Sequence, residues 1–366
     1  MAEEADLNGM APESGAVSTK TRAGNFFEDF HVGQVIRHAT PRTLSGGDVA
    51  LYTALTGSRF AVQSADSFAQ TAGYPRSPID DMLVFHVVFG KTVPDISLNA
   101  VANLGYAGCR FLAPVYPGDT LNAVSEVLGV KENSNRQTGV VYVRSQGFNQ
   151  DGVMVLDYVR WVMVRKRDQA SPAPVETIPV LPKTLHPETL GDACPVISRS
   201  HYDVQLSGSH HRFGDYAPGE RIDHVDGMTV EEAEHQIATR LYQNTAKVHF
   251  NQFAEAQGRH GRRLIYGGHV ISIARALTFN GLGNAFHVAA INAGRHVAPL
   301  FAGATLFAWS EVLECAEVPG RDDVGALRLR TIATRDRPCA DFPRFAGEAY
   351  DPSVLLDLDY WTLIPQ

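Results

Sequence analysis

The sequence contains little cysteine, and none of it occurs as a closely spaced pair. The only cysteines among its 366 residues are Cys109, Cys194, Cys315 and Cys339, and no two of them form a CxxC motif. This spacing argues against a zinc site built on cysteine pairs and against a small disulfide-stapled fold. We expect free thiols in a reducing compartment, and therefore a cytoplasmic protein.

Long apolar runs and a surplus of positive charge are also missing. No window approaches the roughly 20 apolar residues of a membrane span, and the N-terminus lacks the basic-then-apolar pattern of a secretion signal. The net charge of -8 disfavours nucleic acid or an anionic membrane as a partner, although a local basic groove could still bind a small anion. A composition of 44% hydrophobic and 20% charged residues is typical of a soluble globular protein.

Sequence motifs for common cofactors and nucleophiles are absent as well. The segments GGDVAL (46–51) and GLGNAF (281–286) are glycine-rich but lack a Walker lysine or a dinucleotide-binding context. The adjacent His210 and His211 have no spaced metal-ligand partner. No GxSxG nucleophile elbow appears. We expect no nicotinamide, flavin or metal cofactor.

The chain does contain an internal duplication. FEDFHVGQVIRH (27–38) and FGDYAPGERIDH (213–224) share aromatic, Asp, Gly, Ile and His positions at an offset of 186 residues. RFLAPVYPGDTL (110–121) matches RHVAPLFAGATL (295–306) at an offset of 185. LDYVRW and LDLDYW near the two module ends match in the same order. Because polar positions stay in step as well as apolar ones, the pattern indicates a duplicated module of about 140 residues, too long for a solenoid repeat.

Four segments follow from this duplication. We expect a disordered tail over residues 1–24, a first module over 25–167, a proline-rich linker over 168–200 and a second module over 201–366. Each module begins with a short segment whose apolar residues have helical spacing. A central apolar helix follows, and then long strands in which apolar and polar residues alternate. The predicted fold class is α+β, with a sheet wrapped around the central helix of each module.

The motifs in both modules resemble the MaoC-like hydratase form of the hotdog fold. APVYPGDTL (113–121) matches a late strand of that family, while SPIDDMLVFHVVFG (77–90) and LIYGGHVISIARAL (264–277) resemble its central-helix start. Within the family, the whole pattern, including QNTAKVHFN (243–251) and YGGHVISIARAL (266–277), is most similar to the mesaconyl-CoA hydratases, also called β-methylmalyl-CoA dehydratases. The resemblance implies two tandem hotdog modules, each an antiparallel sheet around a central helix, that hydrate a 2-enoyl-CoA.

The resemblance also implies a catalytic pair. The family places an Asp and a His five residues apart, and these positions hold Asn244 and His249 in the second module but Ser58 and Gln63 in the first. The second module is therefore expected to be catalytic and the first to support the substrate pocket. A histidine can transfer protons near neutral pH, whereas an asparagine orients water through its oxygen but takes no proton. The alternative reading of His249 is a histidine on a helix surface or satisfied in the core.

The asparagine leaves the source of a second proton-transfer group open. Either His249 works largely alone, or a carboxylate elsewhere contributes, for which Asp80, Asp81 and Asp66 are candidates. The competing interpretation of these carboxylates is that they cap the N–H groups at helix starts.

Two further groups of residues are candidates for substrate binding. Gly267 and Gly268 precede an apolar helix and match the family's oxyanion position, where backbone N–H groups can stabilise the thioester enolate oxygen; the alternative is a tight turn before the helix. Arginines near the motif positions could bind CoA phosphates or a second substrate carboxylate, with surface solvation as the default; these are Arg59, Arg76, Arg262, Arg263 and Arg295, of which Arg59 is preferred for the carboxylate.

The expected function is reversible hydration of mesaconyl-CoA to β-methylmalyl-CoA. The alternatives are an (R)-specific hydratase for another acyl chain, a hotdog acyl-CoA thioesterase and a non-catalytic acyl-CoA-binding module. An apolar sheet face that pairs two chains leads us to expect a homodimer.

Overall fold

A computed structural model describes residues 20–366 of the chain. Most of the expected disordered tail, residues 1–19, lies outside the described part.

No helix of the described residues is long and apolar enough to cross a membrane. All four cysteines are free, as their spacing predicts. Residues 20–366 contain no group of three or more His, Cys, Asp or Glu side chains arranged to hold a metal ion.

A single curved sheet of eleven strands runs through both halves of the chain. Its path is β1-β4-β5-β6-β3-β8-β13-β10-β9-β7, so the first five positions and the last five mirror each other. The first half supplies β1 (Val35–Arg37), β2 (Arg42–Thr43, beside β4), β3 (Ala100–Phe111), β4 (Thr120–Glu132), β5 (Thr138–Phe148) and β6 (Met154–Arg165). The second half supplies β7 (Arg221–Thr229), β8 (His287–His296), β9 (Thr305–Glu317), β10 (Val324–Arg335) and β13 (Val354–Pro365). A separate hairpin contains β11 (Phe345–Ala346) and β12 (Ala349–Tyr350).

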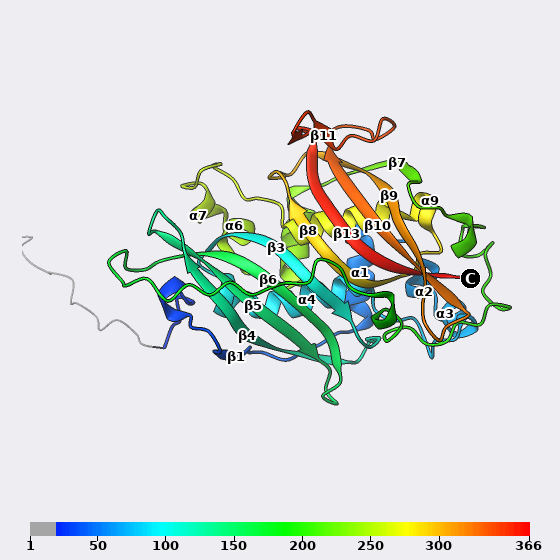
Figure 1. Cartoon of the computed structure of the whole chain (residues 1–366), viewed down its shortest axis with the longest axis horizontal. Helices are drawn as coiled ribbons and strands as arrows, with labels where there is room; N and C mark the ends of the chain where they lie inside the picture. Colours follow the sequence, from blue (N-terminus) through cyan, green and yellow to red (C-terminus); the bar gives the residue numbers. More distant parts are fainter. Residues whose placement is uncertain (1–19) are drawn as a thin grey trace, which may run out of the picture.

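The two halves join edge to edge at β3 and β8. These strands pair antiparallel, with Tyr106 opposite Gly294 and Cys109 opposite Ile291. Figure 1 shows the result as two adjoining curved sheets, blue-green and orange-red, with the helices behind their strands. The predicted α+β arrangement of helix-wrapping sheets is therefore confirmed, and it appears as one continuous sheet.

The two central helices are α4 (Asp81–Thr92) and α8 (Gly267–Leu277). Every residue of α4 from Met82 to Thr92 is buried, which explains why its sequence is apolar on all sides. Across the interface between the halves, Nε2 of His86 on α4 lies 2.7 Å from Oγ of Ser272 on α8. The packing of the halves against each other thus buries both helices in one common core.

Shorter helices surround this pair. They are α1 (Gly46–Thr56), α2 (Ala61–Ser64), α3 (Asp66–Ala72), α5 (Glu232–Leu241), α6 (Lys247–Phe250), α7 (Gln252–Glu255) and α9 (Phe279–Leu282), with single turns η1 (Phe27–Asp29), η3 (Pro187–Thr189) and η4 (Phe213–Asp215) and the π-helical turn η2 (Val93–Ser97). Helix α1 begins where Ser45 and Asp48 form a capping box. It ends at Gly57, whose φ of 67° is left-handed.

The proline-rich segment 168–200 is mostly irregular but is not a loose linker. Its regular structure consists of η3 and one isolated bridge between Val130 and Thr177. Leu190 and Ile197 are almost fully buried, and the backbone N–H of Leu185 donates to Oδ1 of Asn292 on β8 at 2.9 Å. The segment therefore packs against the sheet as it crosses from one half to the other (Figure 1).

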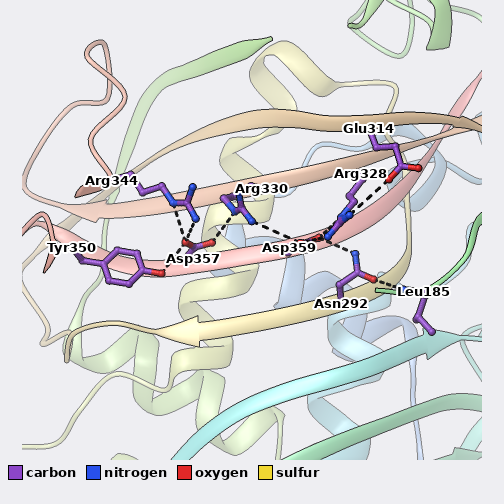
Figure 2. Close-up of polar contacts among 9 residues, drawn as sticks. All are labelled: Leu185, Asn292, Glu314, Arg328, Arg330, Arg344, Tyr350, Asp357 and Asp359. Atoms are coloured by element: carbon purple, nitrogen blue, oxygen red, sulfur yellow. Dashed lines mark hydrogen bonds and ion pairs between the residues drawn. The ribbon is translucent and has the colours of Figure 1, made fainter. Parts of the chain in front are cut away.

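The outer face of the second half carries charges in place of the expected apolar surface. Asp359 on β13 pairs with Arg328 at 2.7 Å, and Asp357 pairs with Arg330 and Arg344. Figure 2 shows these groups as one chain of polar contacts over β10, β13 and β8. The apolar sheet face from which a homodimer was inferred is thus absent from this part of the described structure, because alternate residues of β10 and β13 are ion-paired.

Candidate active site

The segment from Tyr242 to Phe250 is not one continuous helix. Helix α5 ends at Leu241, Gln243 has a left-handed φ of 55°, and α6 begins only at Lys247. Oδ1 of Asn244 accepts the N–H of Ala246 at 3.2 Å, a side-chain-to-backbone bond that stabilises the turn. This break directs the chain so that both Asn244 and His249 line one pocket.

His249 is positioned as a neutral base. Its Nδ1 lies 3.0 Å from the carbonyl oxygen of Leu264, and because a carbonyl only accepts, Nδ1 must carry the proton. The lone pair is then on Nε2, which has no protein partner among the described residues. Burial lowers the pKa of His249 to about 4. The ring is therefore neutral at physiological pH and can accept a proton at Nε2.

Asn244 contributes donors rather than the acceptor that its sequence position suggests. The side chain is only 1% exposed, and its oxygen is already bonded to the backbone of Ala246. Its Nδ2 has no hydrogen-bond partner among residues 20–366. An amide N–H can hold a water through the water's oxygen, while Nε2 of His249 accepts that water's proton.

Gly267 and Gly268 are the first two residues of helix α8, where backbone N–H groups have no partner within the helix. A Cβ on Gly267 would lie 2.5 Å from Cε1 of His296, so only glycine fits beneath that ring. A Cβ on Gly268 would lie 2.5 Å from the ring of Tyr266. Gly267 lines the pocket, and its N–H is at the positive end of the helix dipole, where an oxyanion is stabilised.

The pocket lies between the two halves and has a volume of about 290 Å³. The second half contributes Asn244, His249, Gly267 and His296, and the first half contributes walls that include Phe89, Tyr106 and Arg160. No Asp or Glu is among the lining residues in the described structure. The arrangement therefore combines a neutral base, a water-holding amide and a helix N-terminus without a carboxylate.

Several histidines and tyrosines in and around the pocket were not identified from the sequence. Nε2 of His235 on α5 accepts the N–H of Tyr266 at 2.8 Å, which fixes the start of α8. The ring centroids of His249 and Tyr266 lie 5.4 Å apart. His296 occupies the position of Phe111 in the first module, so the duplicated strand motif contained a signal for it. Burial lowers the pKa of His296 to about 4 as well, and the neighbouring His249 adds to this effect.

The candidate carboxylates lie outside the pocket. Asp80 caps α4 by accepting the N–H of Met82 at 2.9 Å, as the capping interpretation predicts, and burial with the nearby Asp81 raises the pKa of Asp80 to about 6. Asp81 lies 3.0 Å from Nδ1 of His287 on β8 and joins the two halves. Asp66 on α3 is exposed and accepts the N–H of Ser77. None of the three carboxylates lines the pocket, because each accepts a hydrogen bond near the start of its own helix.

The candidate arginines are also placed elsewhere. Arg59 is exposed and lies over the ring of Phe279, and Arg263 pairs with Glu232. Arg295 lies on the outer side of β8 over Tyr350. The remaining two, Arg76 and Arg262, lie over aromatic rings at the surface. The preference for Arg59 as the group that binds a substrate carboxylate is therefore corrected, since its guanidinium is separated from the pocket.

The residues of the first module that correspond to the expected catalytic pair lie outside the pocket. Gln63 occupies the position of His249, and its Nε2 donates to the carbonyl oxygen of Phe286 at 2.8 Å. Ser58 lies in the loop after α1. Neither residue lines the pocket between the two halves.

Comparison with known proteins identifies the family of the chain. A family model described as mesaconyl-CoA hydratase matches residues 10–178. The chain is similar to a β-methylmalyl-CoA dehydratase of Chloroflexus aurantiacus, with 60% identity over 96% of this chain and 99% of the relative. It is also similar to a mesaconyl-CoA hydratase of Cereibacter sphaeroides, with 58% identity over 95% of this chain and 100% of the relative.

Solved structures show the same architecture. A MaoC domain dehydratase structure from Chloroflexus aurantiacus superposes with a TM-score of 0.93 at 60% identity, covering 95% of this chain and 99% of that one. A Mycobacterium tuberculosis protein described as having a double hotdog fold superposes with a TM-score of 0.75 at 24% identity, covering 94% and 99%. The chain therefore belongs to the mesaconyl-CoA hydratase family of MaoC-like proteins with a double hotdog fold.

Proposed function

We propose that the pocket catalyses the reversible addition of water to mesaconyl-CoA, giving β-methylmalyl-CoA. The observation that carries this proposal is the neutral His249, whose unpartnered Nε2 lies in the same pocket as the N-terminus of α8. Membership of the family supports the choice of substrate. The enzyme is accordingly a hydro-lyase.

The geometry supports a mechanism in which one histidine moves the proton. A water held by Nδ2 of Asn244 donates a proton to Nε2 of His249 while its oxygen bonds to the β-carbon of the enoyl thioester. The double-bond electrons move to the α-carbon and the thioester oxygen, where the N–H of Gly267 stabilises the developing negative charge. The protonated His249 then delivers its proton to the α-carbon, which restores the neutral ring. Dehydration follows the same steps in reverse.

A second cavity of about 590 Å³ adjoins the pocket and suits the remainder of CoA. The two cavities share lining residues on β3 and around α6, among them Ala100, Val101 and Val248. The second cavity is lined by the cations Arg165, Lys247 and Arg259, and by His260, against a single carboxylate, that of Glu255. Positive charge at this opening would hold the CoA phosphates while the acyl group reaches His249.

The alternative functions fit the pocket less well. A thioesterase needs a carboxylate or an activated hydroxyl beside the thioester, but the lining contains no carboxylate in the described residues. Oγ of Ser97 also lines the pocket, but it accepts a hydrogen bond from Arg160 and has no histidine partner in the described structure. A non-catalytic acyl-CoA-binding module would not require a base held in one tautomer.

A direct assay separates these functions. With mesaconyl-CoA, we expect the enoyl-thioester absorbance to fall without release of a free thiol. Crotonyl-CoA, which lacks the second carboxylate, should be a much poorer substrate. Thiol release that matches the absorbance change would identify a thioesterase, and equal turnover of both thioesters would identify a hydratase for another acyl chain.

The pH dependence of kcat/KM tests the state of His249. Because burial lowers its pKa from 6.5 to about 4, the base form predominates at every pH well above 4. We expect kcat/KM to stay constant from about pH 8 down to about pH 5.5 and to fall as the pH approaches 4, where His296 titrates too. An acid limb centred near pH 6.5 would contradict a buried neutral base. Circular dichroism across the range controls for acid unfolding.

Assembly and location also remain proposals. We infer a homodimer from exposed apolar side chains near the second cavity, namely Val101, Leu104, Phe250 and Phe253. Size-exclusion chromatography with light scattering tests this, and a monomer at micromolar concentration would contradict it. The four free thiols support a cytoplasmic location.

A further inference from the structure

The pocket contains a buried arginine that has no acidic partner. Arg160 on β6 is 0% exposed, yet no Asp or Glu in the described structure pairs with it. Its Nη2 donates to Oγ1 of Thr92 at 2.7 Å and to Oγ of Ser97 at 3.4 Å, while Nε and Nη1 have no hydrogen-bond partner. A buried guanidinium is costly unless it is paired and its donors are satisfied. Arg160 therefore has an unsatisfied charge and unsatisfied N–H groups in the wall of the pocket.

A second unsatisfied polar side chain lines the same pocket. Both Oδ1 and Nδ2 of Asn103 on β3 are buried without a partner. In the pairing of β3 with β6, Asn103 lies opposite Val162 and Tyr106 lies opposite Arg160. All four residues line the same pocket. Because alternate residues of a strand share one face, Arg160 and Val162 face the pocket together.

The position of Arg160 is maintained by packing. Its guanidinium lies 4.1 Å from the centre of the Phe89 ring, and Phe89 belongs to the fully buried helix α4. This cation–π contact and the hydrogen bonds to the hydroxyl groups of Thr92 and Ser97 hold the guanidinium in place without neutralising its charge. A guanidinium fixed in this way is pre-organised to bind a planar anion with two oxygens, which is the geometry of a carboxylate.

We propose that Arg160, together with Asn103, binds the free carboxylate of a dicarboxylic acyl thioester. The inference rests on the proposed function and specifies which part of the pocket selects the substrate. In mesaconyl-CoA that carboxylate is attached to the carbon that water attacks, so its negative charge opposes the attack. Arg160 neutralises this charge in a site of low dielectric, and it therefore acts on both substrate binding and rate.

The same arrangement accounts for the asparagine at position 244. A carboxylate there would lie beside the attacked carbon, where the substrate already carries a negative charge. Like charges in one buried site repel strongly. A neutral amide holds the water without adding to that repulsion, which suits Asn244 to a substrate with a second carboxylate.

The test compares substrates with and without the carboxylate. In Arg160→Met we expect kcat/KM for mesaconyl-CoA to fall on the order of 10³-fold, because a buried charge pair is lost. The low activity on crotonyl-CoA should stay within about threefold of wild type, since no carboxylate is involved. Asn244→Asp should lower turnover of mesaconyl-CoA more than that of crotonyl-CoA. Arg144→Met is the matched control, because Arg144 on β5 faces the outer side, where it pairs with Asp157.

Binding measurements separate this inference from the proposed function. Succinyl-CoA and butyryl-CoA are saturated thioesters of equal chain length that cannot be hydrated and that differ in the terminal carboxylate. We expect wild type to bind succinyl-CoA at least about 30-fold more tightly, and Arg160→Met to lose that preference. The inference would be overturned if the wild-type protein bound both saturated thioesters equally well. It would also be overturned if Arg160→Met lost the same factor in kcat/KM for mesaconyl-CoA and crotonyl-CoA, even with hydration observed. A wild type that hydrates neither thioester would contradict the proposed function, and the binding comparison would still decide the role of Arg160.

Stability controls complete the design. Removal of an unpaired buried charge should leave the Tm of Arg160→Met equal to or above that of wild type. If Arg160 were purely structural, Tm would fall and both substrates would lose activity together. Should this variant fail to fold, Asn103→Leu provides the same comparison, with an expected loss of about tenfold on mesaconyl-CoA alone.

Discussion

Replacement of His249 by alanine is expected to lower kcat for mesaconyl-CoA hydration by about 10³-fold. The reason is that His249 is the only histidine of the pocket whose tautomer is fixed, with Nδ1 bonded to Leu264 and Nε2 free. The pocket wall also contains no carboxylate that could replace it among the described residues. KM should change little, because the ring acts on the water and not on the CoA portion. Steady-state kinetics at neutral pH measures both constants.

Two controls make this result specific. His249→Gln introduces the residue that the first module has at the equivalent position, Gln63, so it should fold but lose activity to the same extent. His201→Ala removes a histidine that contacts Ser198 outside the pocket and should leave kcat unchanged. If His249→Ala kept more than a tenth of wild-type activity, another group, such as His296, would have to be the base.

Replacement of Gly267 by alanine is expected to lower kcat/KM by about 10²-fold or more. The new Cβ would lie 2.5 Å from Cε1 of His296, so the ring or the start of α8 must move. Either movement displaces the N–H that stabilises the enolate oxygen, and the methyl group also occupies the space that the thioester needs. Because glycine is unfavourable within a helix, the substitution should cost little stability beyond the local clash.

Gly46→Ala is the matched control for that substitution. Gly46 is likewise the first residue of a helix, α1, and a Cβ there meets no atom within 4 Å. Both activity and Tm should remain near wild type. An unchanged kcat/KM in Gly267→Ala would show that the start of α8 does not contact the substrate.

The duplication explains why so much of the fold was predictable. The motif segments 77–90 and 264–277 contain the starts of both central helices, α4 and α8, as predicted. Comparison of Gln63 with His249 also predicted which half contributes this histidine to the pocket. These signals are local or repeat at a fixed offset, so they can be read without knowledge of long-range contacts.

The sequence predicted the polar residues around the site less well than it predicted the fold. The sequence placed His249, Asn244 and Gly267 near one another but suggested a carboxylate helper among Asp80, Asp81 and Asp66, and an arginine at position 59. In the structure those groups have partners elsewhere, whereas in residues 20–366 Arg160 has no acidic partner and leaves Nε and Nη1 without a hydrogen bond, and neither polar atom of the Asn103 side chain has a partner. Whether a polar group is satisfied depends on atoms contributed by distant segments, and no pattern around residue 160 reveals it.

The sequence by itself therefore determined the two-module fold, the family and the histidine of the second module. Only the tertiary structure decided that the modules share one sheet, that the pocket lies between them and that its inner wall holds an unpaired guanidinium. The physical reason is that helix periodicity and capping are set by neighbouring residues. Burial, tautomer and charge pairing instead arise where β6 and α4 of one half meet α6 and α8 of the other.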